Sequence, residues 1–345
     1  MNILVVAGGT LGHIRPALVY INEVKKYNPS ANVYFIATLK DKKYTILNNS
    51  NINEVYYLNA FGMSKSIKKW IVNYKCLNNI SKIIKGKKIN NVIGFGGYIS
   101  GISILAGRLN KCKTFIHEQN SVMGKANRII SKYTNKIYLS YPIKNYKYDN
   151  SKVIGNLVYL EAVTIKQSIY KEKNTILFTS GSLGSKVVNE LAVEFIKSDY
   201  FKKYNQYQVI IITGDAYYLD IKNKLIAYPQ IKVLPFVNNL IEYLCKAEIV
   251  ITRAGASTLF EIMGSNAVPL IIPSPNVTEN HQYYNGLFFT NLECGRLIEE
   301  KNLNIDTFNE ELETIINNYQ TYQTNIKNLN LKSSFMDMVE ETSYE

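Results

Sequence analysis

The sequence predicts an α/β protein made of two Rossmann-like, doubly wound domains that face a cleft. Short apolar runs alternate with longer amphipathic stretches along the chain, which is typical of βαβ units and parallel sheets. Two such series each open with a strand and a Gly-rich turn, first Gly8-Gly9-Thr10 and later Gly181-Ser182-Leu183-Gly184. A length of 345 residues is enough for two domains of ordinary size.

The apolar runs define the expected strands. In the first series they are 3–7, 33–37, 55–58, 91–95, 114–117 and 136–139, and in the second 174–179, 208–213, 231–234, 248–251 and 268–272. A polar stretch after Pro142 interrupts the pattern, so we expect a linker near 140–160. The expected domains are therefore 1–155 and 156–345. The tail over 304–340 has a helical pattern, and we expect a C-terminal helix to pack back on the first domain.

The net charge of +13 is unevenly distributed. Residues 1–155 hold 24 Lys and Arg against 5 Asp and Glu, a balance of +19, whereas residues 156–345 hold 16 against 22, a balance of −6. A uniform compositional bias would not separate the halves in this way. We therefore expect the N-terminal half to face an anionic partner such as nucleic acid, a membrane surface or a small substrate.

Cysteines and apolar stretches indicate a reducing, cytoplasmic protein. The four cysteines form no CxxC pair, so neither a zinc site nor a disulfide framework is expected. No basic region precedes the first apolar run, which argues against a signal peptide. Residues 89–107 are uncharged, but their five glycines favour a strand, a turn and a helix over a membrane span. We expect no transmembrane segment.

Polar residues gather in the loops that follow the expected strands, where open parallel sheets bind their ligands. The chain has three histidines, and His13, His117 and His281 all fall in these loops. The turn at 181–185 and the segment 255–258 each open an expected helix, whose first N–H groups favour a phosphate. For Ser257 and Thr258 the alternative is a simple N-cap, and for Glu261 the alternatives are a ribose contact or an interaction with the helix dipole.

The first Gly-rich loop, "GGTLGHIRP", does not match known nucleotide motifs. Its spacing is not G-x-G-x-x-G, and no acidic residue closes the second expected strand, which ends Ala37-Thr38-Leu39-Lys40. No Gly-Lys-Ser/Thr follows it, so a P-loop is excluded, and the chain has no Asp-x-Asp to clamp a metal on a nucleotide. We therefore expect neither metal nor cofactor, and backbone amides, helix ends and cations such as Arg253 would stabilise a diphosphate.

Six motifs in order resemble the MurG family of peptidoglycan N-acetylglucosaminyltransferases. The specific ones are "HEQN", "GGYISG" and "TRAGASTLFE" followed by "HQYYN", and the resemblance extends from the first Gly-rich loop to Asn285. It implies the GT-B architecture and transfer of N-acetylglucosamine from UDP-N-acetylglucosamine to an undecaprenyl-linked muramoyl-pentapeptide. It also implies a peripheral location at the cytoplasmic face of the membrane.

The resemblance implies positions for donor binding. In the N-terminal half, Thr10, Gly12 and Asn120 match positions near the donor sugar and its phosphates. In the C-terminal half, Ser182 matches a position that contacts diphosphate, Val237 one whose backbone contacts uracil, and Gln282 one near the sugar. The helix start matches the positions that hold phosphate and ribose, with Glu261 on the ribose, and it comprises Ala256, Ser257, Thr258, Leu259, Phe260 and Glu261.

The chain departs from the family pattern at three positions. Leu11 replaces a glycine of the first loop, Leu183 stands where glutamine is usual, and Tyr159 takes the place of an arginine that would approach the donor. A leucine at position 11 would be strained if that position required a positive φ.

The expected reaction is an inverting displacement in which an acceptor hydroxyl attacks the anomeric carbon and UDP leaves. A histidine suits the role of the base that takes the hydroxyl proton, and His13 is our candidate. The alternatives for His13 are acceptor binding or a hydrogen bond that fixes the loop. We expect His117 and Glu118 to be structural.

Residues 60–88 combine apolar side chains with eight lysines and the only tryptophan. This pattern is typical of an interfacial anchor on anionic lipid, and the alternative is an amphipathic helix whose apolar face is core. The expected membrane residues are Phe61, Met63, Ile67, Lys68, Lys69 and Trp70.

Three alternative functions are considered. A related glycosyltransferase could use another lipid acceptor such as diacylglycerol. A UDP-N-acetylglucosamine epimerase would share the fold, but the paired acids and arginines that its site needs are not evident. A nucleic-acid-binding protein would explain the charge, but the chain has no recognition motif, and we expect no nucleic acid partner.

Overall fold

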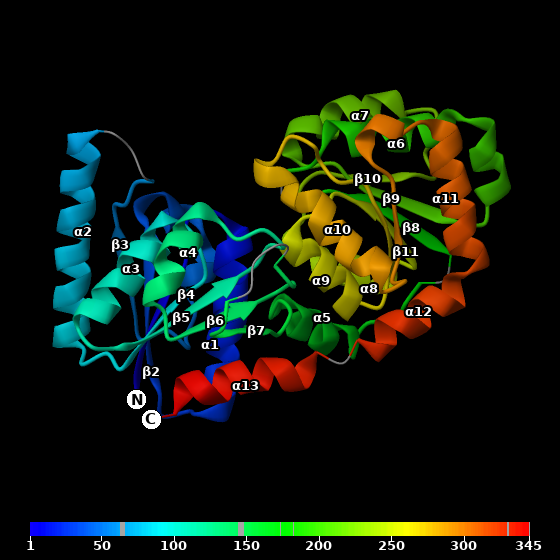
Figure 1. Cartoon of the computed structure of the whole chain (residues 1–345). Coiled ribbons are helices and arrows are strands. Elements are labelled where there is room, and N and C mark those ends of the chain that lie inside the picture. Colours follow the sequence, from blue (N-terminus) through cyan, green and yellow to red (C-terminus); the bar gives the residue numbers. More distant parts are fainter. Residues whose placement is uncertain (63–65, 144–147, 173, 182, 330, 345) are drawn as a thin grey trace. The chain divides into compact units, whose positions relative to one another are not determined.

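The computed structural model describes the chain except for residues 63–65, 144–147, 173, 182, 330 and 345. The chain divides into two compact units (Figure 1). Unit 1 comprises Met1–Leu157 and Leu331–Glu345, and unit 2 comprises Val158–Asn330. Each unit has one parallel sheet whose strands alternate with helices, so the predicted fold class is confirmed.

Unit 1 has a seven-stranded sheet in the order β3-β2-β1-β4-β5-β6-β7. Its strands are β1 (Asn2–Val6), β2 (Asn32–Thr38), β3 (Glu54–Leu58), β4 (Asn91–Gly94), β5 (Lys113–Glu118), β6 (Lys136–Leu139) and β7 (Ser151–Val153). Its helices are α1 (Leu11–Tyr27), α2 (Ile67–Gly86), α3 (Tyr98–Leu109), α4 (Lys125–Ile130) and α13 (Lys332–Ser343), with short 3-10 turns η1 (Leu39–Lys43), η2 (Thr45–Leu47) and η3 (Ser131–Tyr133).

Unit 2 has a six-stranded sheet in the order β10-β9-β8-β11-β12-β13. Its strands are β8 (Thr175–Thr179), β9 (Gln208–Ile212), β10 (Lys232–Leu234), β11 (Ile249–Thr252), β12 (Val268–Ile271) and β13 (Arg296–Leu297). Its helices are α5 (Val158–Lys166), α6 (Lys186–Lys197), α7 (Tyr218–Lys224), α8 (Leu240–Lys246), α9 (Ala256–Gly264), α10 (His281–Asn291), α11 (Ile305–Asn317) and α12 (Tyr319–Asn328), with 3-10 turns η4 (Asp199–Tyr204), η5 (Asp215–Tyr217), η6 (Thr278–Asn280) and η7 (Glu300–Asn302).

The two sheets share one topology. In each, the first strand of the series pairs with the second on one side and with the fourth on the other, so the strand order reverses between β1 and β4 and between β8 and β11. Parallel strands whose order reverses leave a crevice beyond their carboxyl ends, and this is where such sheets bind ligands. We therefore expect ligands to bind at the loops after β1, β4, β8 and β11.

The central strands are buried on both faces, as their near-continuous apolar sequences predict. All of Ile3–Val6 and Ile249–Thr252 lie in the core of their units. The core of unit 2 also contains a group of aromatic rings in which Phe195 packs edge-on against Phe308 with centroids 5.2 Å apart. Each unit therefore has its own hydrophobic core.

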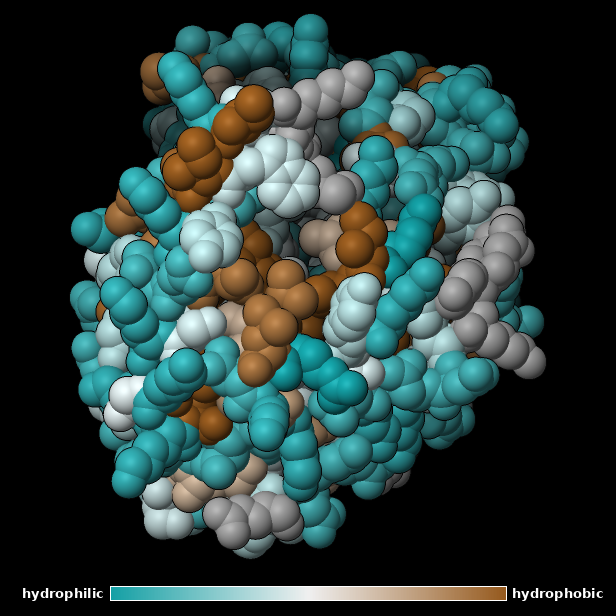
Figure 2. All heavy atoms as spheres, turned by 60° about the vertical axis from the view of Figure 1, so that its left-hand side comes forward, coloured by the Kyte–Doolittle hydropathy of each residue, from teal (hydrophilic) through white to brown (hydrophobic). Residues whose placement is uncertain are grey.

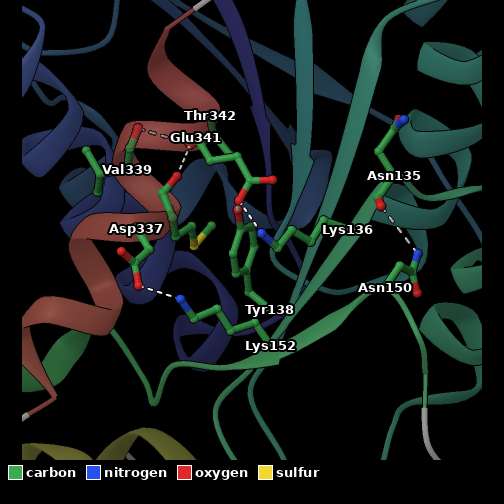
Figure 3. Close-up of polar contacts among 10 residues, drawn as sticks. Asn135, Lys136, Tyr138, Asn150, Lys152, Asp337, Val339, Glu341 and Thr342 are labelled. Atoms are coloured by element: carbon green, nitrogen blue, oxygen red, sulfur yellow. Dashed lines mark hydrogen bonds and ion pairs between the residues drawn. The ribbon is translucent and has the colours of Figure 1, made fainter.

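The C-terminal helix α13 is part of unit 1 (Figure 3). Its carboxylates pair with the last two strands of the sheet, where Lys152 of β7 lies 2.5 Å from Asp337, and Lys136 of β6 pairs with Glu341. The hydroxyl of Tyr138 also donates to Glu341, at 2.7 Å. An acidic helix thus lies against the basic N-terminal part of the chain.

Buried contacts fix the other side of α13. The hydroxyls of Tyr20 and Thr342 are 2.7 Å apart, and the side-chain amide of Asn91 donates to the Thr342 carbonyl at 2.8 Å. Burial raises the pKa of Tyr20 far above its ordinary value, so this phenol stays protonated. Phe335 and Met338 are fully buried, so α13 completes the core of unit 1.

Two edge strands were not predicted. Strand β7 lies within the stretch 140–160 that the sequence assigned to a linker, and β13 has only two residues. Both are short and pair on one side only, with β6 and β12. The unit boundary at Leu157 and Val158 falls two residues after the expected division at 155 and 156.

Candidate active site

Unit 2 contains a cavity of about 370 Å³ at the carboxyl ends of β8 and β11. The loop from β8 to α6 contributes one wall, and the loop from β11 to α9 contributes another. The lining residues are Ser180, Leu183, Gly184, Ser185, Lys186, Tyr217, Arg253, Gly255, Thr258, Ser274 and Gln282. The cavity therefore lies where the topology predicts a ligand site.

Glycine allows the two loops on one side of this cavity to touch. Gly184 has φ +71°, and a Cβ there would lie 1.9 Å from the carbonyl oxygen of Thr213. Gly214 has φ +78°, and its own Cβ would meet the main chain of residues 183 and 184. Only glycine fits both backbones at this separation, so the loop after β8 is held against the loop after β9.

The cavity is electropositive although unit 2 as a whole is not basic. Two helices, α6 and α9, begin at its wall with N-caps Ser185 and Gly255, and a helix N-terminus carries partial positive charge. Lys186, the first residue of α6, adds a full charge. These groups can hold a diphosphate without any carboxylate among the cavity residues to oppose them.

Arg253 plays a more structural part than the sequence suggested. Its Nη1 pairs with Glu300 at 2.7 Å and donates to the Ile272 carbonyl at 3.1 Å, while its Nε donates to the Ser185 hydroxyl at 2.9 Å. The guanidinium thus ties the start of α6 to the rest of the sheet. Glu300 compensates its charge, so Lys186, which sequence reasoning did not single out, is the cation better placed to meet an anion.

The residues expected at the donor fall into three groups. Thr258 and Gln282 line the cavity, and the Gln282 side-chain oxygen accepts from the Ser274 N–H at 2.9 Å. Ala256 and Ser257 occupy the first turn of α9, and Val237 lies half-buried after β10. The side chains of Leu259, Phe260 and Glu261 are buried, and Ser182 lies outside the described residues.

In unit 1 the loop after β1 carries the candidate base. His13 lies in the first turn of α1, and its Nδ1–H donates to the Gly8 carbonyl at 3.1 Å, because a carbonyl can only accept. The neutral ring therefore carries its lone pair on Nε2. Thr10 and Gly12 flank the same helix start and are exposed. A Cβ at Gly96, in the loop after β4, would lie 2.9 Å from Nε2, so the ring fits there only because residue 96 is glycine.

The HEQN turn is built around two buried side chains. His117 donates from Nε2 to the Gly155 carbonyl at 3.1 Å and accepts on Nδ1 from the Gln119 amide at 3.2 Å. Burial lowers the pKa of His117 to about 4, so the ring is neutral. Glu118 accepts from the N–H of Asn120 and from Gly124 and Asn127. These contacts are structural, and they hold the half-buried Asn120 in the loop.

The third histidine, His281, is the first residue of α10 and is not among the residues that line the cavity. Its Nδ1–H donates to the Thr278 carbonyl at 3.0 Å, which caps the turn before the helix. Two residues ahead of it are in the left-handed region, Glu279 at φ +52° and Asn280 at φ +51°. Behind it, Asn285 donates to the Ala254 carbonyl and joins α10 to the loop after β11.

The three departures from the family pattern have different environments. Leu11 is the first residue of α1 and does not have a positive φ, which in this loop is adopted by Gly9 at +91°, so the expected strain is absent. Leu183 is largely exposed at the cavity. The hydroxyl of Tyr159 donates to the Leu329 carbonyl at 3.0 Å, which directs this side chain to the end of α12.

Helix α2 presents two different faces. Cys76, Ile80 and Ile84 belong to the core of unit 1. Its N-terminal half carries an exposed apolar stripe at helical spacing, formed by Ile67 (75% exposed), Trp70 (59%), Ile71 (51%) and Tyr74 (65%). Figure 2 shows apolar side chains reaching the surface among hydrophilic ones on the face where α2 lies in Figure 1. The core interpretation is therefore wrong for this stripe.

The remaining membrane candidates lie beside the stripe. Phe61 is half-buried and is held by Asn73, which accepts from its N–H and donates to its carbonyl. Lys68 and Lys69 are exposed, and Lys69 lies 5.8 Å from the Phe61 ring centroid. Met63 lies outside the described residues. No helix within the described part of the chain is long and apolar enough to cross a membrane.

The other cavity and the cysteines are less suited to bind a substrate or a metal ion. A second cavity of about 290 Å³ adjoins Glu248 and Tyr319 at the amino end of β11, the edge of the sheet at which ligands are not expected. Within the described residues, no group of three or more His, Cys, Asp or Glu side chains is placed to hold a metal ion. The four cysteines are buried, unpaired thiols.

Comparison with known proteins gives matches in both units. Residues 3–139 match the glycosyltransferase family 28 N-terminal domain, and residues 175–342 match the glycosyltransferase family 28 C-terminal domain. The chain is 30% identical over 334 residues to the UDP-N-acetylglucosamine–N-acetylmuramyl-(pentapeptide) pyrophosphoryl-undecaprenol N-acetylglucosamine transferase of Pediococcus pentosaceus, with 92% of this chain and 91% of the relative covered.

Solved structures share the fold over nearly the whole chain. The crystal structure of Acinetobacter baumannii MurG matches with a TM-score of 0.77 at 20% identity, and the match covers 99% of both chains. The UDP-GlcNAc 2-epimerase of Neisseria meningitidis, solved bound to UDP-GlcNAc, matches with a TM-score of 0.70 at 16% identity, again over 99% of both chains. At these identities the structural matches show the fold alone.

Proposed function

The chain belongs to the MurG family of UDP-N-acetylglucosamine–N-acetylmuramyl-(pentapeptide) pyrophosphoryl-undecaprenol N-acetylglucosamine transferases, and on this premise we propose how it acts. It transfers N-acetylglucosamine from UDP-N-acetylglucosamine to the muramoyl-pentapeptide on undecaprenyl pyrophosphate. The observation that carries the proposal is the cavity of unit 2, where two helix N-termini and Lys186 converge.

The donor binds in the unit 2 cavity through its charged and polar groups. The first turns of α6 and α9, with Lys186, hold the diphosphate, and the Thr258 hydroxyl lies in the same wall. The Gln282 side chain meets the sugar, and its orientation is fixed because its oxygen accepts from Ser274. By the family resemblance, Glu261 contacts ribose and the Val237 main chain contacts uracil.

The reaction is a single inverting displacement. The acceptor hydroxyl forms a bond to the anomeric carbon while the bond from that carbon to the β-phosphate oxygen breaks, and UDP carries the electron pair away. His13 takes the hydroxyl proton on Nε2, the nitrogen that its bond to Gly8 leaves as the acceptor. The negative charge that develops on UDP is stabilised by the helix N-termini, which are oriented before the reaction starts.

The lipid-linked acceptor requires the enzyme to work at a membrane surface. The exposed stripe of α2 supplies apolar contact, and Lys68, Lys69 and Lys75 on the same helix supply attraction to anionic lipid of about 1 kcal/mol each. Unit 1 is the basic part of the chain, and the exposed apolar stripe beside this charge favours the anionic cytoplasmic leaflet over nucleic acid as its partner. The enzyme is thus a peripheral protein of the cytoplasmic membrane face.

Donor binding is tested by calorimetry with UDP-N-acetylglucosamine and UDP-glucose on the intact chain. We expect UDP-N-acetylglucosamine to bind more tightly, and Lys186→Ala to weaken both ligands by about tenfold because it removes a charged contact to diphosphate. Lys197→Ala, at the other end of α6, is the matched control and should change neither constant. Equal affinity of Lys186→Ala and the parent chain would contradict the proposed donor site.

The base is tested with His13→Ala under saturating substrates. We expect kcat to fall by about 10²-fold or more, since general base catalysis contributes 10²–10⁴-fold. The same measurement on His281→Ala should give a much smaller loss, because His281 caps a turn and is not among the residues that line the cavity. Near-normal turnover of His13→Ala would exclude His13 as the base.

Membrane binding is tested by sedimentation with anionic vesicles. A variant with Trp70→Ala, Lys68→Gln and Lys69→Gln should lose most of its binding, whereas Ile226→Ser, at an even more exposed apolar position in unit 2, should bind normally. If the triple variant sediments with vesicles as well as the parent chain, α2 is not the anchor.

A further inference from the structure

One buried carboxylate of unit 1 has no part in the chemistry described so far. Asp41 lies in η1, three residues after the end of β2, and its side chain is 1% exposed. Both of its oxygens accept from the Gly9 N–H at 3.1 Å, and Oδ2 also accepts from the N–H of Thr38 at 2.9 Å and from its hydroxyl at 2.5 Å. A buried charge is tolerated only when such donors compensate it.

These bonds hold the loop that carries the candidate base. Gly9 has φ +91°, and its N–H points to Asp41. At the preceding residue, a Cβ on Gly8 would lie 2.8 Å from Thr38 and 2.9 Å from an oxygen of Asp41, so the loop rests directly on the end of β2. The Asp41 carboxylate therefore determines where the Gly8 and Gly9 main chain lies.

The position of Gly8 in turn determines the state of the imidazole. The Gly8 carbonyl accepts from His13 Nδ1–H at 3.1 Å, which selects the tautomer with the lone pair on Nε2 and fixes the plane of the ring. On the other side, the ring lies against Gly96, where a Cβ would approach it to 2.7 Å. A shift of Gly8 would rotate or release His13, because this carbonyl is its hydrogen-bond partner.

Asp41 also occupies one of the first main-chain donors of the Gly-rich loop, the Gly9 N–H. A loop of this kind binds phosphate through its first main-chain N–H groups. Here the Gly9 N–H is taken by a carboxylate, whose negative charge would repel a second anion at the same place. The start of this loop is thus organised around an internal anion, and the main chain of Gly8 and Gly9 serves to orient His13.

We propose that Asp41 is a positioning residue of the transfer reaction, which holds the loop after β1 so that His13 presents Nε2 to the acceptor hydroxyl. This inference rests on the proposed function, because it assigns Asp41 a role through the proposed base. Asp41 touches neither substrate. Its effect should therefore appear in the rate of the chemical step and leave donor binding in the unit 2 cavity unchanged.

The test is a double-mutant cycle between Asp41→Asn and His13→Ala with the full-length chain. An asparagine keeps the shape but offers one acceptor oxygen, and its NH₂ group would face the donors of Gly9 and Thr38. In the parent background we expect kcat to fall by about tenfold or more, since misplaced catalytic groups cost up to about 10²-fold, with KM for UDP-N-acetylglucosamine changed by less than about twofold. In the His13→Ala background, Asp41→Asn should change kcat by less than about twofold.

Two further measurements separate positioning from general destabilisation. Glu23→Gln, a carboxylate on the same helix as His13 that pairs only with Lys26, should leave kcat and melting temperature unchanged. Amide exchange at Gly9 should accelerate at least about tenfold in Asp41→Ala, and this readout does not require activity.

The outcomes are distinct. An Asp41→Asn variant with parental kcat, or one that loses the same factor in both backgrounds, overturns the proposal. Unchanged amide exchange at Gly9 in Asp41→Ala overturns it as well, even if this variant loses activity. A parent chain with no transferase activity refutes the proposed function instead, and the exchange measurement then still decides whether Asp41 holds the loop.

Discussion

Acidification should destabilise unit 1 through His117. This side chain is fully buried, and burial lowers its pKa from 6.5 to about 4, although its bond to Gly155 acts in the opposite direction. The unfolded chain keeps the ordinary value, so between these two values it binds more protons than the folded chain does. The stability that the neutral ring provides is therefore complete above about pH 6.5 and is lost as the pH falls toward 4.

The magnitude follows from the difference between the two pKa values. A fall from 6.5 to about 4 corresponds to roughly 3 kcal/mol in total. About 2 kcal/mol of this should be lost between about pH 7 and pH 5, where the folded ring is still mostly neutral and the unfolded one is protonated. Urea unfolding at the two pH values, followed by amide exchange in β5, measures the loss, and His117→Gln should show a smaller difference between them.

A direct titration can refute this reasoning. The chain has only three histidines, so its ring proton spectrum contains three signals that His13→Ala and His281→Ala assign. The His117 signal should stay in its neutral position down to about pH 5. A midpoint near 6.5 for this signal would show that burial does not control the ring.

Two further predictions concern the packing of α13 and the packing of Gly96 against the His13 ring. Phe335→Ala should lower the free energy of unfolding by about 3–5 kcal/mol, because the ring is fully buried, whereas Asp337→Asn, which breaks a half-exposed pair with Lys152, should cost less than about 1 kcal/mol. Urea unfolding measures both, and equal losses would contradict this division. Gly96→Ala should reduce kcat by about tenfold or more, because its Cβ would displace the His13 ring. If kcat falls only in proportion to the fraction of protein that remains folded, the prediction is contradicted.

Most of the fold can be predicted from the apolar pattern, because a parallel strand that is buried on both faces appears in the sequence as a short continuous run of apolar residues. Each of the eleven predicted strands has a counterpart in the structure. The two missed strands lack this signal, since β7 is the partly exposed Ser151–Val153 at the end of a polar stretch and β13 is two residues long. The contacts of α13 join residues about 200 positions apart, such as Lys136 and Glu341, and no local pattern encodes such a pairing.

The candidate site was less predictable than the fold. The motifs place Thr258, Gln282 and His13 at strand ends, where the topology brings the ligand. The sequence alone does not show that Asp41 turns back to Gly9, because the known nucleotide motif has its acidic residue at the end of the second strand, and Asp41 comes three positions later. The pair Thr38 and Asp41 at capping-box spacing is the local signal that could have revealed it.

The transfer reaction itself is the most direct test of the central claim. The purified chain is incubated in anionic vesicles with UDP-N-acetylglucosamine and undecaprenyl-pyrophosphoryl-muramoyl-pentapeptide, and all products are identified by mass spectrometry. The account predicts release of UDP in step with addition of one N-acetylglucosamine to the lipid-linked acceptor, and no reaction with diacylglycerol. Conversion of UDP-N-acetylglucosamine to its 2-epimer, or transfer to diacylglycerol in place of the muramoyl-pentapeptide, would contradict it.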